Sequence, residues 1–459
     1  SPYALVEGAR MRCATIATAV GGIPYMMESG VTGLLFQPRD VDTLAAFMVR
    51  LVENPAFRRQ LGENFYEKAE SVYSAEATVQ HQLDIYRTIL RQCAAKKEKR
   101  RGVVICGAYG KGNAGDEAIL KAILRQLQHI DPDMPITVLS HNPRSTRLTH
   151  HVGAVYVFNP FSFLPVMRRT KLYLSGGGSL IQNQTSTRSL YYYLLSIRLA
   201  RLTGNKVLMY GCGIGPVNGD GCRRLSARVI DKNVDAITLR EDLSAEELKS
   251  MGVTKPSVYV TADPALLLAP GSDGAVDGFL LGNNIDPAGS YALFVLRDWP
   301  GFEEKKDAFV QAAKFAKERC GLQPIFFALE PNRDLPPSRE VARSLGFDCP
   351  MLSAPADEKL IIGMMKKMRV VVSMRLHALI FASSVAAPLV AVSYDPKVTG
   401  FMHYIGQKHC VYFEDVTAEK LCGLISGALS DPAEYSVGHL RALAAQNEEI
   451  ARKLLEEAT

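Results

Sequence analysis

The sequence predicts an α/β fold in which two Rossmann-like parallel-sheet domains face a cleft, with a partial Rossmann-like segment before them. Short apolar runs that end in glycine alternate with amphipathic helical stretches along most of the 459 residues, as in doubly wound parallel sheets. Two breaks in composition, a basic one at 96–101 and one rich in Gly, Asp, Asn and Pro at 271–290, divide these stretches into blocks. Hydrophobic residues make up 47% of the chain and charged residues 22%, which excludes a disordered, collagenous or coiled-coil protein.

The two breaks define three blocks. Residues 1–95 form the partial segment, 102–270 the first Rossmann-like half, and 291–459 the second half with a closing helix. The run KKEKRR at 96–101 is expected to be a basic linker, and 271–290 the connection between the halves. Two such halves on either side of a cleft make the GT-B type of architecture, in which ligands bind beyond the carboxyl ends of the strands.

Composition also limits the partners and the compartment. The formal net charge of +6 is small for this length, and the chain has no RNP, helix-turn-helix or zinc-finger pattern, so nucleic acid is not an expected partner. The nine cysteines have neither C-x-x-C nor zinc-ligand spacing, which indicates thiols of a reducing compartment and no metal site. The most apolar stretch, Ala378–Val392, is too short to span a bilayer. We expect a cytoplasmic protein with at most peripheral contact between 96–101 and the inner face of the membrane.

The first half begins with a glycine-rich turn. A strand predicted at Val103–Cys106 runs into GAYGKGNAGDEAIL, whose glycines precede an amphipathic helix. Free backbone N–H groups and the positive end of a helix dipole suit a phosphate or carboxylate. The spacing is neither that of a P-loop nor that of G-x-G-x-x-G, so neither ATP nor NAD is indicated. Further glycine turns are predicted at Ser175–Asn183 and Tyr210–Val217, and Ser244 with Glu247 is expected to form a capping box.

The second half places charged side chains where predicted strands end. Such side chains meet at one edge of a parallel sheet. An arginine two residues from a histidine at a helix start, with a lysine after the next strand, favours an anion site. The cationic or titratable residues are Arg297, Arg375, His377 and Lys397, after strands predicted at 291–296, 370–373 and 389–393.

Residues 1–40 resemble the nucleotide-sugar-binding half of family 4 retaining GT-B glycosyltransferases. Glu7 matches the second of two glutamates that the family places eight positions apart, and the first would lie upstream of the printed sequence. The resemblance implies that Glu7 accepts hydrogen bonds from sugar hydroxyls, and that Gly21 and Gly22 approach a diphosphate. Tyr25 stands where the family usually has an acidic residue. We expect a truncated remnant of a longer polypeptide, without glycosyltransferase activity in this chain.

Seven motifs in residues 102–431 resemble the polysaccharide pyruvyl transferase family. In chain order they are G-x-Y-G-x-G-N-x-G-D-E-A-I-L, S-G-G-G-S-L, G-x-G-I-G-P, R-x-x-x-S, A-D-P, S-x-R-L-H-A-L-I-F-A and S-Y-D-P-K-V-x-G-F. The resemblance implies transfer of pyruvate from phosphoenolpyruvate to a sugar as a 4,6-ketal, typically on N-acetylmannosamine of a lipid-linked cell-wall polysaccharide precursor. Polymer modified in this way is what S-layer homology domains bind. Phosphoenolpyruvate is then a co-substrate, and neither cofactor nor metal is required.

A pyruvyl transferase site needs cations for the phosphate and the carboxylate of phosphoenolpyruvate. It also needs one group that donates a proton and one that accepts a proton. His377 is the expected proton donor to the enol carbon, because its ordinary pKa lies near neutrality. Asp116 or Asp263 is the expected base toward the sugar hydroxyl. The expected substrate-binding residues are Arg375, Lys397, Arg297, Gly110, Gly112, Asn113, Gly177 and Gly178.

Two other readings remain open from the residues alone. A nucleotide-sugar-dependent GT-B glycosyltransferase would use the same scaffold, and a non-catalytic polysaccharide-binding protein would use the same cleft. Release of phosphate, release of UDP, or binding without turnover separates the three.

Overall fold

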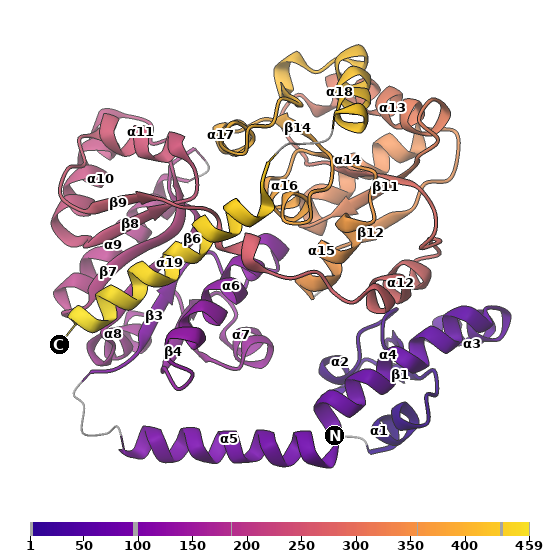
Figure 1. Ribbon diagram of the computed structural model, residues 1–459, viewed down its shortest axis with the longest axis horizontal. Coiled ribbons are helices and arrows are strands. Elements are labelled where there is room, and N and C mark those ends of the chain that lie inside the picture. The colour runs from indigo at the N-terminus through magenta and orange to yellow at the C-terminus, as the bar shows by residue number, and fades with distance from the viewer. Residues whose placement is uncertain (1–2, 95–99, 185, 356, 432–434, 459) are drawn as a thin grey trace. The chain divides into compact units, whose positions relative to one another are not determined.

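The computed structural model describes residues 3–94, 100–184, 186–355, 357–431 and 435–458. The chain forms two compact units. One contains residues 1–96, 270–290 and 359–367, and the other contains 97–269, 291–358 and 368–459. The larger unit holds two parallel sheets of Rossmann type, and the protein therefore has a GT-B-type fold (Figure 1).

The first half of the larger unit is built on a seven-stranded sheet in the order β5-β4-β3-β6-β7-β8-β9, and every pairing in it is parallel. Its strands are β3 (Val103–Cys106), β4 (Ile136–Ser140), β5 (Gly153–Tyr156), β6 (Leu172–Ile181), β7 (Lys206–Ile214), β8 (Ala236–Leu239) and β9 (Ser257–Val260). Its helices are α6 (Ala114–Ile130), α7 (Pro143–His150), α8 (Pro160–Arg169), α9 (Thr187–Leu202), α10 (Asp220–Asn233), α11 (Asp242–Met251) and the 3₁₀ helix η2 (Pro264–Leu267). The long helix α19 (Val437–Glu457) returns from the second half onto α6, β7 and η2 (Figure 1).

The second half has a six-stranded parallel sheet in the order β12-β11-β10-β13-β14-β15. Its strands are β10 (Tyr291–Val295), β11 (Gln323–Ala328), β12 (Met351–Ser353), β13 (Val370–Ser373), β14 (Leu389–Ser393) and β15 (Cys410–Tyr412). Its helices are α13 (Phe302–Glu318), α14 (Pro331–Arg343), α16 (Leu376–Ser383), α17 (Pro396–Tyr404), η3 (Phe413–Asp415) and α18 (Ala418–Ser430). Helix α15 (Glu358–Lys366), which precedes β13 in the chain, belongs to the smaller unit from residue 359 onward. In both sheets the strand order reverses beside the first strand, between β3 and β6 and between β10 and β13, which is where doubly wound folds bind ligands.

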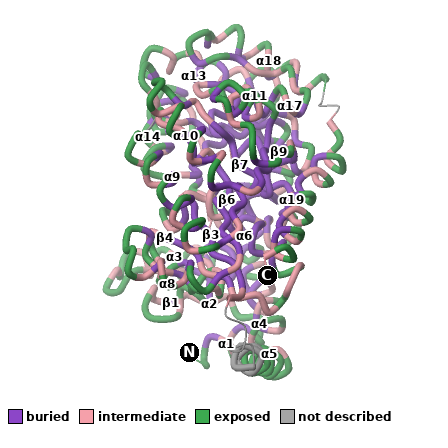
Figure 2. Tube along the Cα trace, turned by 90° about the vertical axis from the view of Figure 1, so that its left-hand side faces the viewer, coloured by how far each residue is buried: buried purple, intermediate pink, exposed green. Residues whose placement is uncertain are grey.

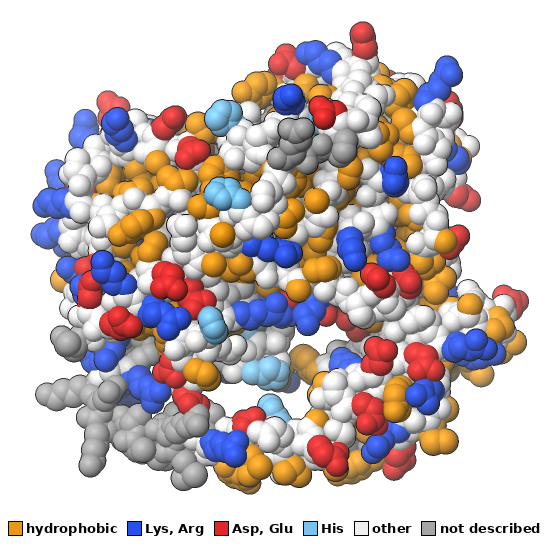
Figure 3. Space-filling model, in the orientation of Figure 1, with side chains coloured by type: hydrophobic (Ala, Val, Ile, Leu, Met, Phe, Trp, Pro, Cys, Tyr) orange, Lys and Arg blue, Asp and Glu red, His pale blue; other side chains and the backbone are white. Residues whose placement is uncertain are grey.

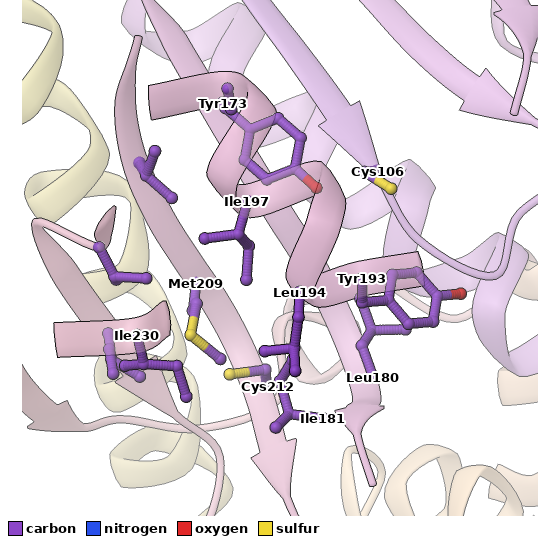
Figure 4. Packing of buried hydrophobic residues seen from close by; sticks show 14 of the residues in the cluster. Cys106, Tyr173, Leu180, Ile181, Tyr193, Leu194, Ile197, Met209, Cys212 and Ile230 are labelled. Carbon is purple, nitrogen blue, oxygen red and sulfur yellow. The ribbon is translucent and has the colours of Figure 1, made fainter. Parts of the chain in front are cut away.

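Alternate residues of the first sheet build its core. Tyr173, Met209 and Cys212 point to the face that α9 and α10 cover, where they meet Leu194 and Ile230 (Figure 4). Because successive strand side chains point to opposite faces, the intervening residues pack on the other side, where the hydroxyl of Tyr210 donates to Gln126 of α6 (2.7 Å). Covering both faces with helices leaves the carboxyl edge of the sheet as the place for polar chemistry.

The smaller unit contains the N-terminal segment. Strands β1 (Ile16–Thr18) and β2 (Leu34–Phe36) form a two-stranded parallel sheet. The helices are α1 (Tyr3–Arg10), α2 (Ile23–Met26), α3 (Val41–Glu53), α4 (Pro55–Tyr73) and α5 (Ala75–Ala94), joined by α12 (Asp273–Gly282). The guanidinium of Arg50 donates to the carbonyl of Leu281 (3.0 Å) and to Asn284 (3.0 Å). The stretch 271–290, expected to be a connection, thus contains a helix that packs in the same compact unit as residues 1–96.

The two glycine turns predicted at 175–183 and 210–217 are wrong. β6 and β7 run through these glycines and pair with one another, with Gly178 opposite Cys212. Gly177 and Gly178 adopt φ values of +59° and +72°, which only glycine adopts without strain, so the strand bends and continues. Glycine here permits an irregular strand rather than ending one.

Within the described part of the chain, no helix is both long enough and apolar enough to cross a membrane. The basic run at 96–101 lies largely outside the described residues. Arg100 donates to the carbonyl of Thr170 (2.6 Å), and Arg101 pairs with Asp131 (3.2 Å). Arg100 and Arg101 therefore form contacts within the fold.

Candidate functional site

The turn after β3 is held by side chains of its own helix. Asn113 caps α6: its Oδ1 accepts from the N–H of Gly115 (3.1 Å), and its Nδ2 donates to Oδ2 of Asp116 (2.8 Å). The N–H of Gly110 donates to Oε1 of Glu117 (2.7 Å). The helix start that was expected to bind an anion thus has two of its N–H groups satisfied internally, while Gly112, at φ +76°, has open space around it.

Asp116 is the titratable group of this turn. Burial, and then repulsion from Glu117, raise the pKa of Asp116 to about 7, although Arg240, Lys111 and Lys397 oppose the shift. A carboxyl with this pKa exchanges a proton near neutral pH, as an acid–base group must.

His377 lies against the same turn, at the start of α16. A Cβ atom on Gly115 would overlap its Nδ1, so only glycine allows the N-termini of α6 and α16 to approach this closely. The Nε2 atom is buried and has no hydrogen-bond partner among the described residues. Burial, with Arg240 and Lys397 nearby, lowers the pKa of His377 to about 3, so the free site holds a neutral imidazole.

Arg240 follows β8 and is almost fully buried. Its guanidinium bonds Oδ2 of Asp263 (3.0 Å), Oε2 of Glu241 (3.1 Å) and the hydroxyl of Ser179 (3.1 Å). Asp263 also accepts from the N–H of Ala265 (3.0 Å). Both oxygens of Asp263 are therefore engaged in holding Arg240 and the chain after β9. The role of Asp263 as a base stays a prediction.

The capping box expected of Ser244 and Glu247 is wrong. α11 begins after Glu241, and the hydroxyl of Ser244 donates to the carboxylate of Glu241 while accepting from the N–H of Ile214 (2.8 Å). Ser244 thus joins the end of β7 to the arginine cluster, because a buried hydroxyl must use its bonding capacity on whatever polar groups are near.

Arg375 lies at the carboxyl end of β13 and caps α16. Its Nη1 donates to Oε2 of Glu330 and to Oδ1 of Asp334, both at 3.1 Å. Arg297, after β10, approaches the same Glu330 oxygen at 3.5 Å. Burial raises the pKa of Asp334 to about 7, although Arg297 and backbone hydrogen bonds oppose the shift. The two arginines meet across the point where the strand order of this sheet reverses.

Lys397 lies at the start of α17 and is one of the cations near Asp116. Its Nζ lies 2.9 Å from Oδ2 of Asp395, the residue that caps this helix. It also lines a pocket of about 170 Å³ into which both halves contribute side chains. The lining residues are Ser179, Ile214, Gly215, Pro216, Glu241, Leu243, Ser244, Glu247, Pro396 and Lys397.

The comparison with protein families identifies the family of the chain. Residues 113–396 match the family described as polysaccharide pyruvyl transferase. The chain belongs to the polysaccharide pyruvyl transferase family. By its description, this family consists of transferases that act on polysaccharide.

The N-terminal segment of this pyruvyl transferase family member has different relatives. Residues 1–54 match glycosyl transferases group 1. A D-inositol 3-phosphate glycosyltransferase of Nocardioides sp. is 39% identical over 72 residues, 16% of this chain and 16% of that protein. That of Kribbella flavida is 33% identical over 96 residues, 20% of this chain and 22% of that protein. The match thus spans less than a quarter of these curated relatives.

Solved structures share the fold. The UDP-GlcNAc 2-epimerase of Methanocaldococcus jannaschii superposes with a TM-score of 0.54 at 12% identity, over 77% of this chain and 99% of that one. The epimerase of Neisseria meningitidis, bound to UDP-GlcNAc, gives 0.54 at 13%, over 77% and 100%. Anabaena HepE, in complex with UDP and glucose, gives 0.52 at 12%, over 78% and 100%. At these identities the likeness establishes the fold alone.

In this pyruvyl transferase family member the structure brings Asp116, His377, Lys397 and Gly178 together, whereas Arg297 and Arg375 meet at Glu330. Asp116 and His377 share the same cations, and Gly178 lies beside Asp116, since a Cβ there would be 3.6 Å from Oδ1. Gly177 instead packs on Ile119. The roles predicted for these residues are not tested by the geometry and stay predictions.

The sequence did not reveal the residues that form hydrogen bonds and ion pairs with the predicted site residues. Arg240 and Glu241 belong to the sequence ITLRED at 237–242, in which charged residues follow an apolar run, and this was the available signal. Glu330 followed a predicted strand in EPNRD, but an acid there gave no sign of pairing with Arg375.

In the smaller unit, the three predicted nucleotide-sugar residues lie on or beside the first helices. Glu7 is exposed on α1, Gly21 has φ +57°, and Gly22 precedes α2. Among the described residues of the whole chain, no three His, Cys, Asp or Glu side chains are grouped to hold a metal ion.

Proposed function

We propose that the larger unit transfers pyruvate from phosphoenolpyruvate to a sugar diol, with N-acetylmannosamine of a lipid-linked cell-wall precursor as the preferred acceptor. The observation that carries the proposal is the gathering of Arg240, Lys397 and Lys111 around Asp116, a carboxyl with a pKa of about 7. Phosphoenolpyruvate brings a phosphate and a carboxylate, so its site needs several cations within a few ångströms.

The reaction balances without a further reagent. A proton adds to the CH₂ carbon of phosphoenolpyruvate, one sugar hydroxyl bonds to the central carbon, the second hydroxyl replaces phosphate there, and the products are the ketal and hydrogen phosphate. Of the two hydroxyl protons, one ends on the new methyl group and the other on phosphate. The chain has to hold the substrate, supply one proton and accept another.

His377 and Asp116 are the groups proposed for these proton transfers. His377 is neutral in the free site, and a bound dianion would raise its pKa and let it carry the proton to the enol carbon. Asp116, the residue after Gly115, would accept the proton of the hydroxyl in its ionised form. His377→Gln should keep phosphoenolpyruvate binding while turnover falls by roughly 10²-fold or more. Near-normal turnover of His377→Gln, with Asp116→Asn inactive, would assign both transfers to Asp116.

Acceptor-dependent release of phosphate is the direct test. The full chain is incubated with phosphoenolpyruvate and an N-acetylmannosamine-containing acceptor, and phosphate is measured with and without the acceptor. Asp116→Asn should lower the rate by about 10²- to 10⁴-fold. Asp307→Asn, which removes an exposed carboxylate of α13, is the matched control and should leave it unchanged. Phosphate release that is independent of acceptor, or equal in the two variants, would contradict the proposal.

A nucleotide-sugar glycosyltransferase is the second candidate, because residues 1–54 match that class. It would release UDP from a UDP-sugar in the same assay. Asp116→Asn would leave that release unchanged if it arose in the smaller unit, so this variant separates the two activities in one chain.

A further inference from the structure

An acid-free stretch gives the first half an unusual surface. Residues 134–219 contain no aspartate or glutamate but nine lysines and arginines, in a chain with 47 acidic residues overall. The stretch includes α7, β5, α8, β6, α9 and β7. Asp235 and Glu457, which lie outside the stretch, pair with Arg201 and Lys206. The other seven cations have no ion-pair partner among the described residues, so the surface of the stretch is positive and attracts anions.

Helix α9 presents part of this stretch to solvent as a continuous row. The α9 stripe consists of Arg188, Tyr191, Leu195, Arg198 and Leu202, spaced alternately three and four residues apart. Such spacing places all five on one side of the helix. Leu195 is 53% exposed and Leu202 71% exposed. Within the described part of the chain, neither Arg188 nor Arg198 has an ion-pair partner. Arg201 pairs with Asp235 and is therefore not part of the α9 stripe.

An aromatic cluster of Tyr156, Phe158 and Phe161 continues the surface beyond α9. Phe158 is 54% exposed and Phe161 90% exposed. The ring of Phe158 lies edge-on to Tyr192 of α9, with centroids 5.2 Å apart, and the Tyr192 hydroxyl donates to the carbonyl of Val157 (2.9 Å). The cluster is therefore fixed to α9 rather than carried by a separate loop. It follows β5 and so lies at the carboxyl edge of the sheet, as the candidate site does.

The figures show this surface as open. Figure 2 looks at the side of the molecule on which α8, α9 and α10 lie, and much of their outward surface is exposed. In Figure 3 the edge formed by α9 and α10 carries Lys and Arg side chains with hydrophobic side chains beside them. Arg224 and Arg228 of α10 are exposed, which extends the basic character to the neighbouring helix.

We propose that the α9 stripe and the aromatic cluster form a docking surface for an anionic lipid bilayer. Arginine, tyrosine and leucine on one side of α9, with phenylalanine in the neighbouring aromatic cluster, are the composition of surfaces that lie in the bilayer interface. The rings and aliphatic chains enter the interface, and the guanidinium groups meet lipid phosphates. A nucleic acid would use the arginines but leave Leu195, Leu202 and Phe161 in water. The acid-free stretch provides the charge complementarity that selects an anionic membrane.

The docking surface does not depend on the proposed function. Under that function it has a consequence, because it would bring the carboxyl edge of the first sheet toward a lipid-linked acceptor. Failure of vesicle binding would leave phosphate release from a soluble acceptor intact, so the two proposals fail separately.

Vesicle sedimentation of the full chain tests the proposal. Binding is compared between phosphatidylcholine vesicles and mixed phosphatidylcholine–phosphatidylglycerol vesicles, at low and high salt. We expect binding to the mixed vesicles that weakens with salt. Arg188→Ser with Arg198→Ser should lower the partition coefficient by roughly tenfold or more, from about fivefold for each cation near the surface. Leu195→Ser with Leu202→Ser should lower it too. The control is Arg339→Ser with Arg343→Ser, exposed arginines of α14, and should bind like the parent.

A fluorescence measurement keeps the test independent of folding defects. The chain has one tryptophan, so Phe161→Trp adds a single new reporter in the aromatic cluster. Its emission should shift to the blue when mixed vesicles are added and stay unchanged with phosphatidylcholine alone. Equal binding of all variants, or an unshifted emission, overturns the proposal. A leucine variant that changes the chain from dimer to monomer without altering vesicle binding also overturns it, and assigns the surface to a second copy.

Discussion

Asp116 has a pKa that gives a signed prediction for stability. The folded chain keeps the proton on this carboxyl up to about pH 7, while an unfolded chain releases it near pH 4. The folded state binds more protons between these values, so the free energy of unfolding falls as pH rises through this window. Asp116→Asn removes this dependence. Its melting temperature should therefore rise relative to the parent from pH 5 to pH 8, as measured by thermal unfolding. The Asp307→Asn control should show no such trend, and a variant that loses stability relative to the parent at pH 8 would refute the assignment.

Arg375 gives the second prediction for a single residue. Its guanidinium is nearly buried between Glu330 and Asp334. Arg375→Ala removes the cation that Glu330 and Asp334 share, although Arg297 stays beside Glu330. Because it also removes the proposed clamp for an acidic group of the substrate, we expect phosphoenolpyruvate use to fall by about 30-fold or more, equivalent to ~2 kcal/mol. Thermal unfolding should also shift downward. The ratio kcat/KM for phosphoenolpyruvate is the readout, and an unchanged ratio would show that Arg375 only supports the strand end.

Single residues also show where sequence reasoning stops. The placement of Arg375, His377 and Lys397 at strand ends follows from the apolar runs before them. β13 and β14 have the predicted bounds, and a helix, α16, begins directly after Arg375 as predicted. The partner of Arg375 did not follow, because Glu330 lies 45 residues away and meets it only through the pairing of β10 with β11 and β13. The local sequence pattern determines where a strand or helix begins. Which side chains form an ion pair depends on the order of the strands in the sheet.

At the level of elements, the irregular glycines of β6 mark the limit of the same reasoning. A glycine within an apolar run was taken to end the strand, yet the ladder between β6 and β7 continues to Ile181 and Ile214. A glycine is found both where a strand ends and where a strand bends, so the sequence alone does not distinguish the two. Pairing with a neighbouring strand decides between them, and a single sequence does not contain it.

Gly177→Ala tests that bend. Gly177 adopts φ +59°, and a Cβ there would overlap Cγ2 of Ile119 on α6. Overpacking together with the unfavourable backbone should lower the free energy of unfolding by about 2–4 kcal/mol. Gly423→Ala in α18, where a Cβ meets no neighbour, should stay level or gain about 1 kcal/mol from helix propensity. Chemical denaturation measures both, and equal stabilities would show that β6 relaxes around the added methyl group.

For the whole molecule, the residues before the basic run carry the clearest revision. Because residues 1–95 resemble a different family and the pyruvyl transferase motifs lie in 102–431, the sequence predicts that deleting 1–95 leaves pyruvyl transfer largely intact. The structure indicates that the deletion also removes packing contacts, because α12 packs on α4 and Leu281 contacts the apolar cluster of Leu51, Phe57 and Leu61. We now expect the shortened chain to catalyse the transfer but to aggregate and melt at a lower temperature, since it exposes an apolar helix side.

Leu281→Ser in the shortened chain distinguishes exposure from loss of structure. It should restore solubility without changing phosphate release, as judged by light scattering and the phosphate assay. In the full chain the same substitution buries a hydroxyl among apolar groups and should lower stability. A shortened chain that is unfolded with or without Leu281→Ser would show that the N-terminal residues are integral to the fold.

The packing of α12 has an evolutionary consequence. A Cβ on Gly282 would lie 2.5 Å from the carbonyl oxygen of Gly30, so the two glycines allow one backbone to pass close to another. A side chain at Gly282 is tolerated only if the backbone at Gly30 gives way, whereas a side chain at Gly30 is disfavoured by the φ of +84° at that position. Selection on the connection between the Rossmann-like halves therefore acts on the N-terminal segment as well, whether or not that segment retains a nucleotide-sugar site. We expect Gly30 and Gly282 to be inherited together in chains that keep both parts, and Gly282 to drift freely in chains that have lost the first.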